Sequence, residues 1–554
     1  MGRNILQSSI QNASFSIIFQ VIFRAITFFL NAFIIRTVGH DVLGIMNVRL
    51  LLLESTILFL SKEPLLKACL SDTKSQNWAQ IINQMWISVP ISALLSLILS
   101  YVWLYILSPV EEIYVNQYTL GCYSMAISCV VEQMTQNFIL VAQSFCFVKL
   151  RIILETLYIL IRTFTFVYLI IYYPHNAIGA FAIAQIVSSI TLCLSYYLFF
   201  AWYIPKLNVY NKKDDNAFSY YTKQLFVNMK DFPFKSWLDF FPGHMDNENA
   251  FLDKNLCVLT VSFAKQSVIK QILTEGEKYV MTISPLMTFT QQSMYEIVNN
   301  LGSLAARFIF RPIEESAYFY FTQMIKRNVP LKDQNQKSIK ESALVLRQLL
   351  NVILSIGLVI LVFGQSYSYT LLYLYGGQKL VDNILPVTLL RFHSFAVVLL
   401  AINGVSEGFV FATMSNEQLD RYNYLMVFFS LLFLSLSYIL TILFGPVGFI
   451  IANCVNMLAR ILHSIHYITN MYKGTILKPL GGLIPRWKFL CILLLSAYFT
   501  KMSELFILHT SVLMHILFGG MFFIFTIMVW GYDNKELLYI GYKKFKERQS
   551  IKEE

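Results

Sequence analysis

Hydrophobic residues gather in long segments that alternate with short polar stretches along the chain. A mainly apolar segment of about 20 residues forms a helix that can cross the hydrocarbon core of a bilayer. Segments of this kind lie near residues 10–37, 42–61, 80–106, 115–145, 149–172, 177–203, 253–274, 280–322, 341–363, 384–412, 422–443, 446–472, 487–505 and 508–530. The pattern predicts an all-α polytopic membrane protein with about 14 transmembrane helices. The eighth segment is too long for one span, so its ends are expected to project from the bilayer.

Composition and charge agree with this class. The chain is 56% hydrophobic and 14% charged, whereas soluble proteins carry about 25% charged residues. The net charge of +11 does not indicate nucleic-acid binding, because the basic residues concentrate in every second predicted loop. The intervening loops hold only Arg36, Lys278, Lys379 and Lys501. Since basic loops stay on the cytosolic side, we expect the N- and C-termini in the cytosol.

A polar stretch from about residue 204 to 250 divides the predicted spans into six before it and eight after it. Spans six and twelve begin alike, each after a short turn with proline, at Ile178-Gly179 and Val447-Gly448. We therefore expect two parallel six-helix lobes around a central cavity, a known transporter plan, with an added helix pair. The expected parts are an N-terminal lobe (1–203), a cytosolic linker (204–250), a C-terminal lobe (251–473), an extra transmembrane helix pair (474–532) and a basic cytosolic tail (533–554).

Charged side chains recur inside the apolar segments. A charge at membrane depth costs about 2.5–3.5 kcal/mol on insertion scales, so these residues are expected to face a polar cavity rather than lipid. Helical spacing places them on stripes. Span one aligns Gln20, Arg24, Thr27 and Asn31, and span eight aligns Gln292, Glu296, Asn300, Ser303, Arg307, Arg311 and Glu314.

Arginines on several helices suggest an anionic ligand, because the guanidinium stays charged and donates two parallel hydrogen bonds to a phosphate. The residues expected to line the cavity are Arg24, Asn31, Arg49, Glu296, Asn300, Arg307, Arg391, Asn403, Glu407 and Arg460. The alternative is that polar stripes only bridge helices, at about 0.6 kcal/mol for each bond. We favour this second interpretation for Gln20, Asn453 and Asn456. For Glu155 and Arg162, which lie two turns apart, we expect structural pairing, either locally or with a neighbour.

No motif predicts an enzyme. The eight cysteines lack paired spacing, no His/Cys ligand set predicts a metal, and no hydrolase elbow, phosphate loop or paired-carboxylate signature is present. We expect no catalytic residues and no cofactor. A cation-coupled exporter is a distant alternative, because no aspartate falls inside a predicted span and only the glutamates could carry the coupling ion.

Several segments resemble the eukaryotic Rft family of endoplasmic-reticulum membrane proteins, within the multidrug/oligosaccharidyl-lipid/polysaccharide flippase superfamily. They are FRAITFFLNAFIIR (23–36), NVRLLLLESTILFLSKE (47–63), ILTEGEKYVMT (272–282), VNNLGSLAARFIFRPIEES (298–316), LLAINGVSEGFVFAT (399–413), DRYN (420–423) and GPVGFIIANC (445–454). The resemblance extends over essentially the whole chain. It implies two six-helix lobes around a central cavity with two added helices.

The resemblance also implies a function. The family delivers a dolichyl-diphosphate-linked heptasaccharide, Man5GlcNAc2, from the cytosolic to the lumenal leaflet of the endoplasmic reticulum for N-glycosylation. Two hypotheses stay open: the chain moves the glycolipid itself, or it is a non-transporting accessory or scaffold protein of the same pathway. The expected partners are the glycolipid, the membrane and other N-glycosylation proteins.

One shorter resemblance concerns Arg307. The segment AARFIFRP is similar to the eighth helix of bacterial flippases for lipid-linked cell-wall precursors. Those proteins carry a diphosphate-binding arginine there, which implies the same role for Arg307.

Glycosylation-site tags test the predicted topology. Tags near Lys212 and at the C-terminus should stay unmodified because both positions are predicted to be cytosolic. A tag near Gln378 should be modified in the lumen. A gel shift that endoglycosidase removes is the measurement, and modification of the C-terminal tag would contradict the topology.

Overall fold

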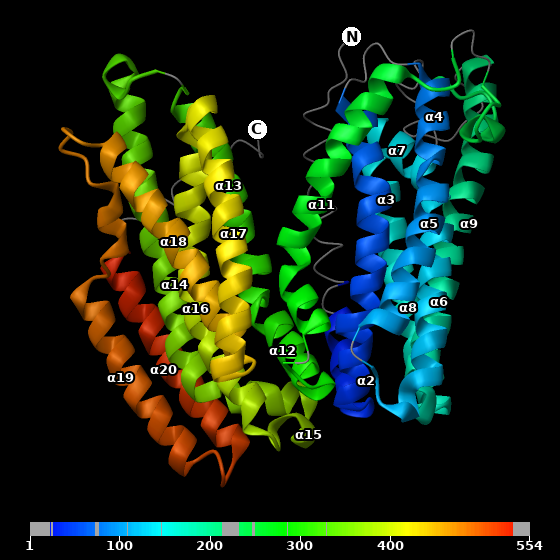
Figure 1. Ribbon diagram of the computed structural model, residues 1–554. Helices are drawn as coiled ribbons and strands as arrows, with labels where there is room; N and C mark the ends of the chain where they lie inside the picture. The colour runs from blue at the N-terminus through cyan, green and yellow to red at the C-terminus, as the bar shows by residue number, and fades with distance from the viewer. Residues whose placement is uncertain are drawn as a thin grey trace. The chain divides into compact units, whose positions relative to one another are not determined.

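The computed structural model describes residues 23, 26–71, 77–107, 109–145, 147–212, 232–245, 250–284, 286–327 and 329–535. All the regular elements in these ranges are helices (Figure 1). They form two compact units, residues 1–293 and 294–554. The Arg24 side chain, predicted to line the cavity, lies outside the described residues, as does most of the first predicted span.

The first unit begins with a short apolar helix, Ile26–Thr37. Its further α-helices are α2 (His40–Gly44), α3 (Leu51–Ser71), α4 (Trp78–Trp86), α5 (Ser88–Tyr101), α6 (Val115–Gln133), α7 (Gln136–Ser144), α8 (Val148–Tyr172), α9 (Ala177–Lys212) and α11 (Lys254–Ile283). The next helix, α12 (Phe289–Gly302), crosses the boundary between the units.

The second unit holds the remaining helices. They are α13 (Arg311–Met324), α14 (Gln336–Gly376), α15 (Gln378–Val381), α16 (Ile384–Thr413), α17 (Asn416–Phe444), α18 (Val447–Met471), α19 (Trp487–Phe506) and α20 (Val512–Asp533). The helix α11, which is the seventh predicted span, belongs to the first unit together with the helices before it. The predicted lobe boundaries stay a prediction.

Length and apolar composition identify the helices that can cross a membrane. Among the described residues, 11 helices qualify, or up to 12 if the bent pair Glu112–Gln133 and Gln136–Ser144 forms one span. The first predicted span falls short because only its second half is described. The eighth is helical from α12 through α13 but too polar to qualify. The protein is thus a polytopic helical membrane protein, and the count of 14 stays a prediction.

The same pattern of helix contacts occurs inside each of the two units. In the first unit α5 packs on α6, and both α6 and α8 pack along α9. In the second unit α14 packs on α16, and both α16 and α17 pack along α18. The contact of α3 with α6 likewise matches that of α13 with α16. This correspondence supports the internal repeat that the short matches at Gly179 and Gly448 suggested.

Gly448 shows why the start of α18 needs a glycine. A Cβ atom at this position would meet the backbone of Leu440 and Thr441 in α17. Only a residue without a side chain lets the two helices approach this closely. The absence of a side chain thus permits the tight contact between the end of α17 and the start of α18.

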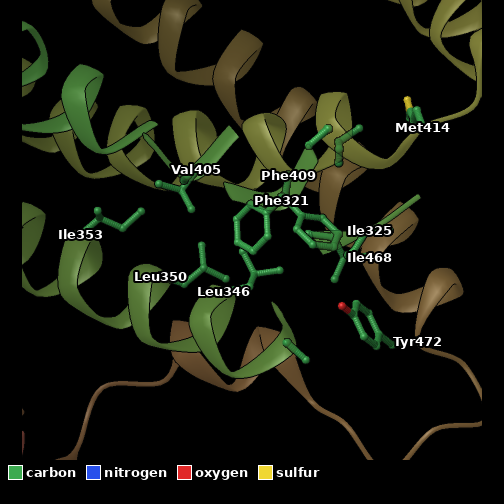
Figure 2. Packing of buried hydrophobic residues seen from close by; sticks show 14 of the residues in the cluster. Phe321, Ile325, Leu346, Leu350, Ile353, Val405, Phe409, Met414, Ile468 and Tyr472 are labelled. Atoms are coloured by element: carbon green, nitrogen blue, oxygen red, sulfur yellow. The ribbon is translucent and has the colours of Figure 1, made fainter. Parts of the chain in front are cut away.

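The core of the second unit lies where α13, α14, α16 and α18 meet. Figure 2 shows the rings of Phe321 and Phe409 at its centre, with Leu346 and Leu350 of α14 beside them. The two ring centroids are 4.9 Å apart in an edge-to-face arrangement, a geometry that aromatic pairs prefer. This packing fixes α13 against α16.

An aromatic cluster in the first unit includes part of the predicted linker. The segment 232–245 brings Phe234 and Phe240 into the core of α7 and α9. The Phe240 ring stacks on that of Phe138 with centroids 4.3 Å apart, and Trp86 Nε1 donates to the Phe240 carbonyl at 2.7 Å. The helix α9 itself continues to Lys212. Two parts of the predicted linker are therefore built into this unit.

Candidate functional site

The polar stripe of the eighth predicted span divides into a buried half and an exposed half. Gln292 and Glu296 are buried, and Gln292 Nε2 donates to the carbonyls of Met281 and Met287, at 3.1 Å each. Asn300, Arg307 and Arg311 are exposed. The exposed half therefore lies at the surface, while Gln292 in the buried half secures the start of α12.

Close packing at two glycines positions this stretch against α16. A Cβ at Gly302 would meet the imidazole of His393, and one at Gly404 would meet the carboxyl group of Glu314. Both contacts join the α12–α13 stretch to α16. Since Arg307 lies between Gly302 and Glu314 in sequence, its backbone is held at both ends.

Arg307 sits in a π-helical segment, Ala306–Phe310. Its Nη2 donates to the Asn300 carbonyl at 2.7 Å, and its Nε to the Ser303 carbonyl at 3.4 Å. These bonds draw the guanidinium back along its own helix. A guanidinium has five N–H donors, so this geometry is compatible with a bidentate contact to a phosphoryl group.

Arg49, like Arg307, lies in a π-helical segment, but its side chain is buried. It lies in the π-helical segment Ile45–Leu50, which leads into α3 as Ala306–Phe310 leads into α13. The Arg49 side chain is only 1% exposed, and its guanidinium lies 5.4 Å from the ring centroid of Phe289. Such π-helical turns occur often at functional sites. The two arginines therefore share a local fold, but only Arg307 is exposed.

Three of the predicted site residues meet in the core of the second unit. Glu407 pairs with Arg460 through Oε1 to Nε at 3.1 Å and Oε2 to Nη2 at 2.5 Å. Tyr422 Oη donates to Glu407 Oε1 at 2.7 Å, and Asn403 Nδ2 donates to Oε2 at 3.2 Å. This set ties α16, α17 and α18 together around a buried carboxylate. The geometry is that of a helix-bridging ion pair, which was the alternative interpretation of the stripes.

Arg391 has its partner in the added helix pair. Its guanidinium forms an ion pair with the carboxylate of Glu504 in α19, and its Nε donates to the Gln365 carbonyl of α14 at 2.9 Å. Lys501 Nζ also contacts Glu504, at 2.7 Å. Arg391 thus joins α16 to α14 and to α19.

Sequence reasoning missed a corresponding polar cluster in the first unit. The carboxylate of Glu54 accepts from Gln185 Nε2 at 2.7 Å and from Tyr158 Oη at 3.3 Å. Arg162 Nη1 lies 3.9 Å from Glu54 Oε2, whereas Glu155 pairs with Arg151 at 2.7 Å. Both residues are therefore structurally paired, as expected, but not with each other: Glu155 pairs locally with Arg151, and Arg162 with Glu54 of α3. Both charges were visible in the apolar segments, but no local spacing links residue 54 to residue 162.

The predicted site residues thus fall into different environments. Asn31, on the helix Ile26–Thr37, is exposed, as are Asn300 and Arg307. Arg49 and Glu296 are buried, and the remaining described members belong to the ion-paired groups around Glu407 and Glu504. Among the described residues, no group of three or more His, Cys, Asp or Glu side chains is arranged to hold a metal ion.

Comparison with known sequences gives long matches. The profile of a family described as Rft protein matches residues 8–544. A relative from Drosophila melanogaster is 51% identical over 91% of this chain and 93% of its own length. A relative from Xenopus tropicalis is 40% identical over 100% of both chains. Each relative is named Man(5)GlcNAc(2)-PP-dolichol translocation protein RFT1.

Two solved structures share the fold. A structure of the lipid II flippase MurJ in an inward closed conformation has a TM-score of 0.56, with 94% of this chain and 99% of that chain covered. An inward-facing MATE-family transporter of the MOP superfamily has a TM-score of 0.52, with 80% and 94% covered. Each is 11% identical to this chain, so the likeness concerns the fold alone.

The Glu407–Arg460 pair generates a stability prediction. Arg460→Ala should lower the free energy of unfolding by about 3–5 kcal/mol, because Glu407 is left buried without its cation. Combining it with Glu407→Gln should recover part of this loss, since the amide carries no charge. Thermal unfolding of the purified protein in detergent measures both effects.

A matched control is Arg421→Ala in α17. Arg421 pairs with Glu417 at 2.6 Å, but both side chains are exposed, so the change should cost at most about 1 kcal/mol. Equal losses for Arg460→Ala and Arg421→Ala would contradict the structural role of the buried pair.

Proposed function

We propose that this chain, which belongs to the Rft family, moves Man(5)GlcNAc(2)-PP-dolichol between the leaflets of a membrane. The observation that carries this proposal is the family match over residues 8–544, together with relatives that are named for this translocation and align over nearly the whole chain. The chain is a transporter rather than an enzyme. We place it in the endoplasmic-reticulum membrane with both termini cytosolic, which the alternating basic loops favour.

The main free-energy barrier to this movement is the transfer of the polar, charged headgroup through the hydrocarbon core. Polar groups lose their hydrogen bonds to water in hydrocarbon, and an isolated charge there is far more costly. A protein lowers this barrier if it offers donors and cations along the path of the headgroup. The dolichyl chain can stay in lipid, because it is as apolar as the bilayer core.

Arg307 is the residue to which we assign the diphosphate. Its guanidinium is exposed on the stripe formed by Asn300, Ser303 and Arg311, and the packing at Gly302 and Gly404 holds its helix in place. Arginine suits a phosphoryl group because its planar fork donates two hydrogen bonds at once. Arg24 is proposed as a second diphosphate contact, from its place on the predicted stripe of span one.

The other candidate residues take supporting roles in this proposal. Asn31 and Asn300 are exposed amides that can exchange hydrogen bonds with sugar hydroxyls. Arg49 and Glu296 are buried, and Glu296 lies about one helical turn before Asn300 in α12. Arg391, Asn403, Glu407 and Arg460 hold the helices of the second unit in register through their ion pairs and hydrogen bonds.

Substitution of Arg307 tests the assignment. Arg307→Ala should weaken binding of the diphosphate glycolipid about 10-fold or more, which corresponds to a loss of about 1.4 kcal/mol or more. Arg307→Lys should rescue binding only in part, because an ammonium is a point charge without the planar fork. Titration of labelled glycolipid into purified protein in nanodiscs is the measurement.

Arg311→Ala is the matched control. Arg311 lies one turn further along the same exposed stretch, but it pairs locally with Glu315 at 2.9 Å, so binding should change little. If Arg307→Ala folds normally and binds the glycolipid like the native protein, the diphosphate assignment is wrong.

A further inference from the structure

Two lysines and one glutamate form a compact charged group between α3 and α11. Lys67 Nζ lies 3.3 Å from Glu63 Oε1, and Lys270 Nζ lies 3.1 Å from the same oxygen. Lys67 and Glu63 belong to α3, while Lys270 comes from α11, which packs along α3. One carboxylate therefore holds two ammonium groups, and the group carries one excess positive charge.

Aromatic rings fix the lysine side chains in a reciprocal way. The ammonium of Lys67 on α3 lies 6.0 Å from the ring centroid of Phe263 on α11. The ammonium of Lys270 on α11 lies 5.3 Å from the ring centroid of Phe59 on α3. Each lysine crosses to the opposite helix, where the ring faces attract the cation. The two ammonium groups are thus held side by side before any ligand arrives.

The position of this group makes the excess charge costly. Lys270 lies within the apolar helix Lys254–Ile283, and Glu63 and Lys67 lie near the end of the apolar helix His40–Leu70, just beyond the predicted span 42–61. A helix pair at the membrane needs one lysine to neutralise Glu63, whereas the second lysine adds an uncompensated charge, which is unfavourable next to hydrocarbon. Yet the Lys270 side chain is 52% exposed and that of Lys67 36%. An anion at this surface would balance the excess charge.

We propose that Lys67 and Lys270, held by Glu63, form a further contact site for the diphosphate of the lipid substrate, on the first unit. This inference rests on the proposed function. A diphosphate diester carries two ionised phosphoryl groups joined by one oxygen. The two ammonium groups both contact Glu63 Oε1, at 3.3 and 3.1 Å, so they are close enough together for each to contact one phosphoryl group. Each ammonium has three N–H donors, so it can keep Glu63 and still donate to a phosphoryl oxygen. The site gives the headgroup a cationic contact distinct from Arg307.

Binding to purified protein in phosphatidylcholine nanodiscs tests the site. The probes are dolichyl diphosphate, dolichyl monophosphate and inorganic pyrophosphate, which separate the number of phosphates from the lipid anchor. Lys67→Gln/Lys270→Gln should weaken dolichyl diphosphate binding at least 10-fold, because two charge-assisted contacts are lost. The loss for the monophosphate should be smaller, and pyrophosphate should bind more weakly than the dolichyl diphosphate.

Two further variants separate binding from folding. The triple variant Glu63→Gln/Lys67→Gln/Lys270→Gln leaves no uncompensated carboxylate and should lose binding to the same extent as the double variant. Glu63→Gln alone removes a competing negative charge and should bind at least as tightly as the native protein. Lys278→Gln is the matched control, because Lys278 lies on the same helix and pairs locally with Glu275 at 3.1 Å.

The outcomes are distinct. Native-like affinity of a folded triple variant would overturn the lysine site while leaving the proposed function intact. A loss in Glu63→Gln as large as in the triple variant would also overturn it, since the group would then act only in packing. Failure of the native protein to bind dolichyl diphosphate at all would instead count against the proposed function.

Discussion

The low dielectric constant of the bilayer core is the constraint on which this structure depends. A charge there is costly, so each ionisable side chain within a span needs an opposite charge, a set of hydrogen bonds or a polar surface. The described residues show the first solution at Glu54 with Arg162, at Arg391 with Glu504 and at Glu407 with Arg460. They show exposed cations at Arg307 and Lys270. Lys270 is exposed although it also pairs with Glu63 of α3. The buried pairs hold helices together, whereas we propose that these exposed cations contact a ligand.

The ion-paired groups also explain how each unit can act as a rigid body. In the second unit the Glu407 group joins three helices, and the Arg391–Glu504 pair adds the extra helix α19 to them. In the first unit Gln185 and Tyr158 connect α8 and α9 to α3 through Glu54. Removing one member of such a buried pair leaves an uncompensated charge. A transporter that changes conformation between its lobes benefits from lobes that do not deform internally.

Much of the fold could be predicted from the sequence, because a hydrophobic segment of sufficient length has few other structures open to it in a bilayer. The spans of α5, α8, α16, α17, α18 and α20 lie close to the predicted segments, whereas α9 and α14 continue beyond theirs. The break between α6 and α7 and the π-helical turns were missed, because they arise from local backbone geometry that apolar composition does not encode. The docking of Phe234 and Phe240 was missed because the predicted linker reads as polar overall.

The candidate site was harder to predict. Helical spacing placed Asn300, Arg307 and Arg311 on one exposed stretch, because neighbours on one helix follow a fixed period. The same reasoning could not tell that Arg460 faces Glu407, or that Arg391 faces Glu504, since these partners are 53 and 113 residues away in sequence. A charge inside a span indicates that a partner exists, but only the tertiary packing identifies it.

We infer that this chain itself carries the lipid-linked oligosaccharide across a membrane. The most direct measurement reconstitutes the purified protein in liposomes that contain labelled Man(5)GlcNAc(2)-PP-dolichol in both leaflets. A mannose-binding lectin added outside captures the glycolipid that reaches the outer leaflet. If the chain moves the glycolipid, the captured amount should rise beyond the share initially in the outer leaflet and approach all of the labelled glycolipid. Capture that stops at the level of protein-free liposomes, with folded protein present in every vesicle, would contradict this inference.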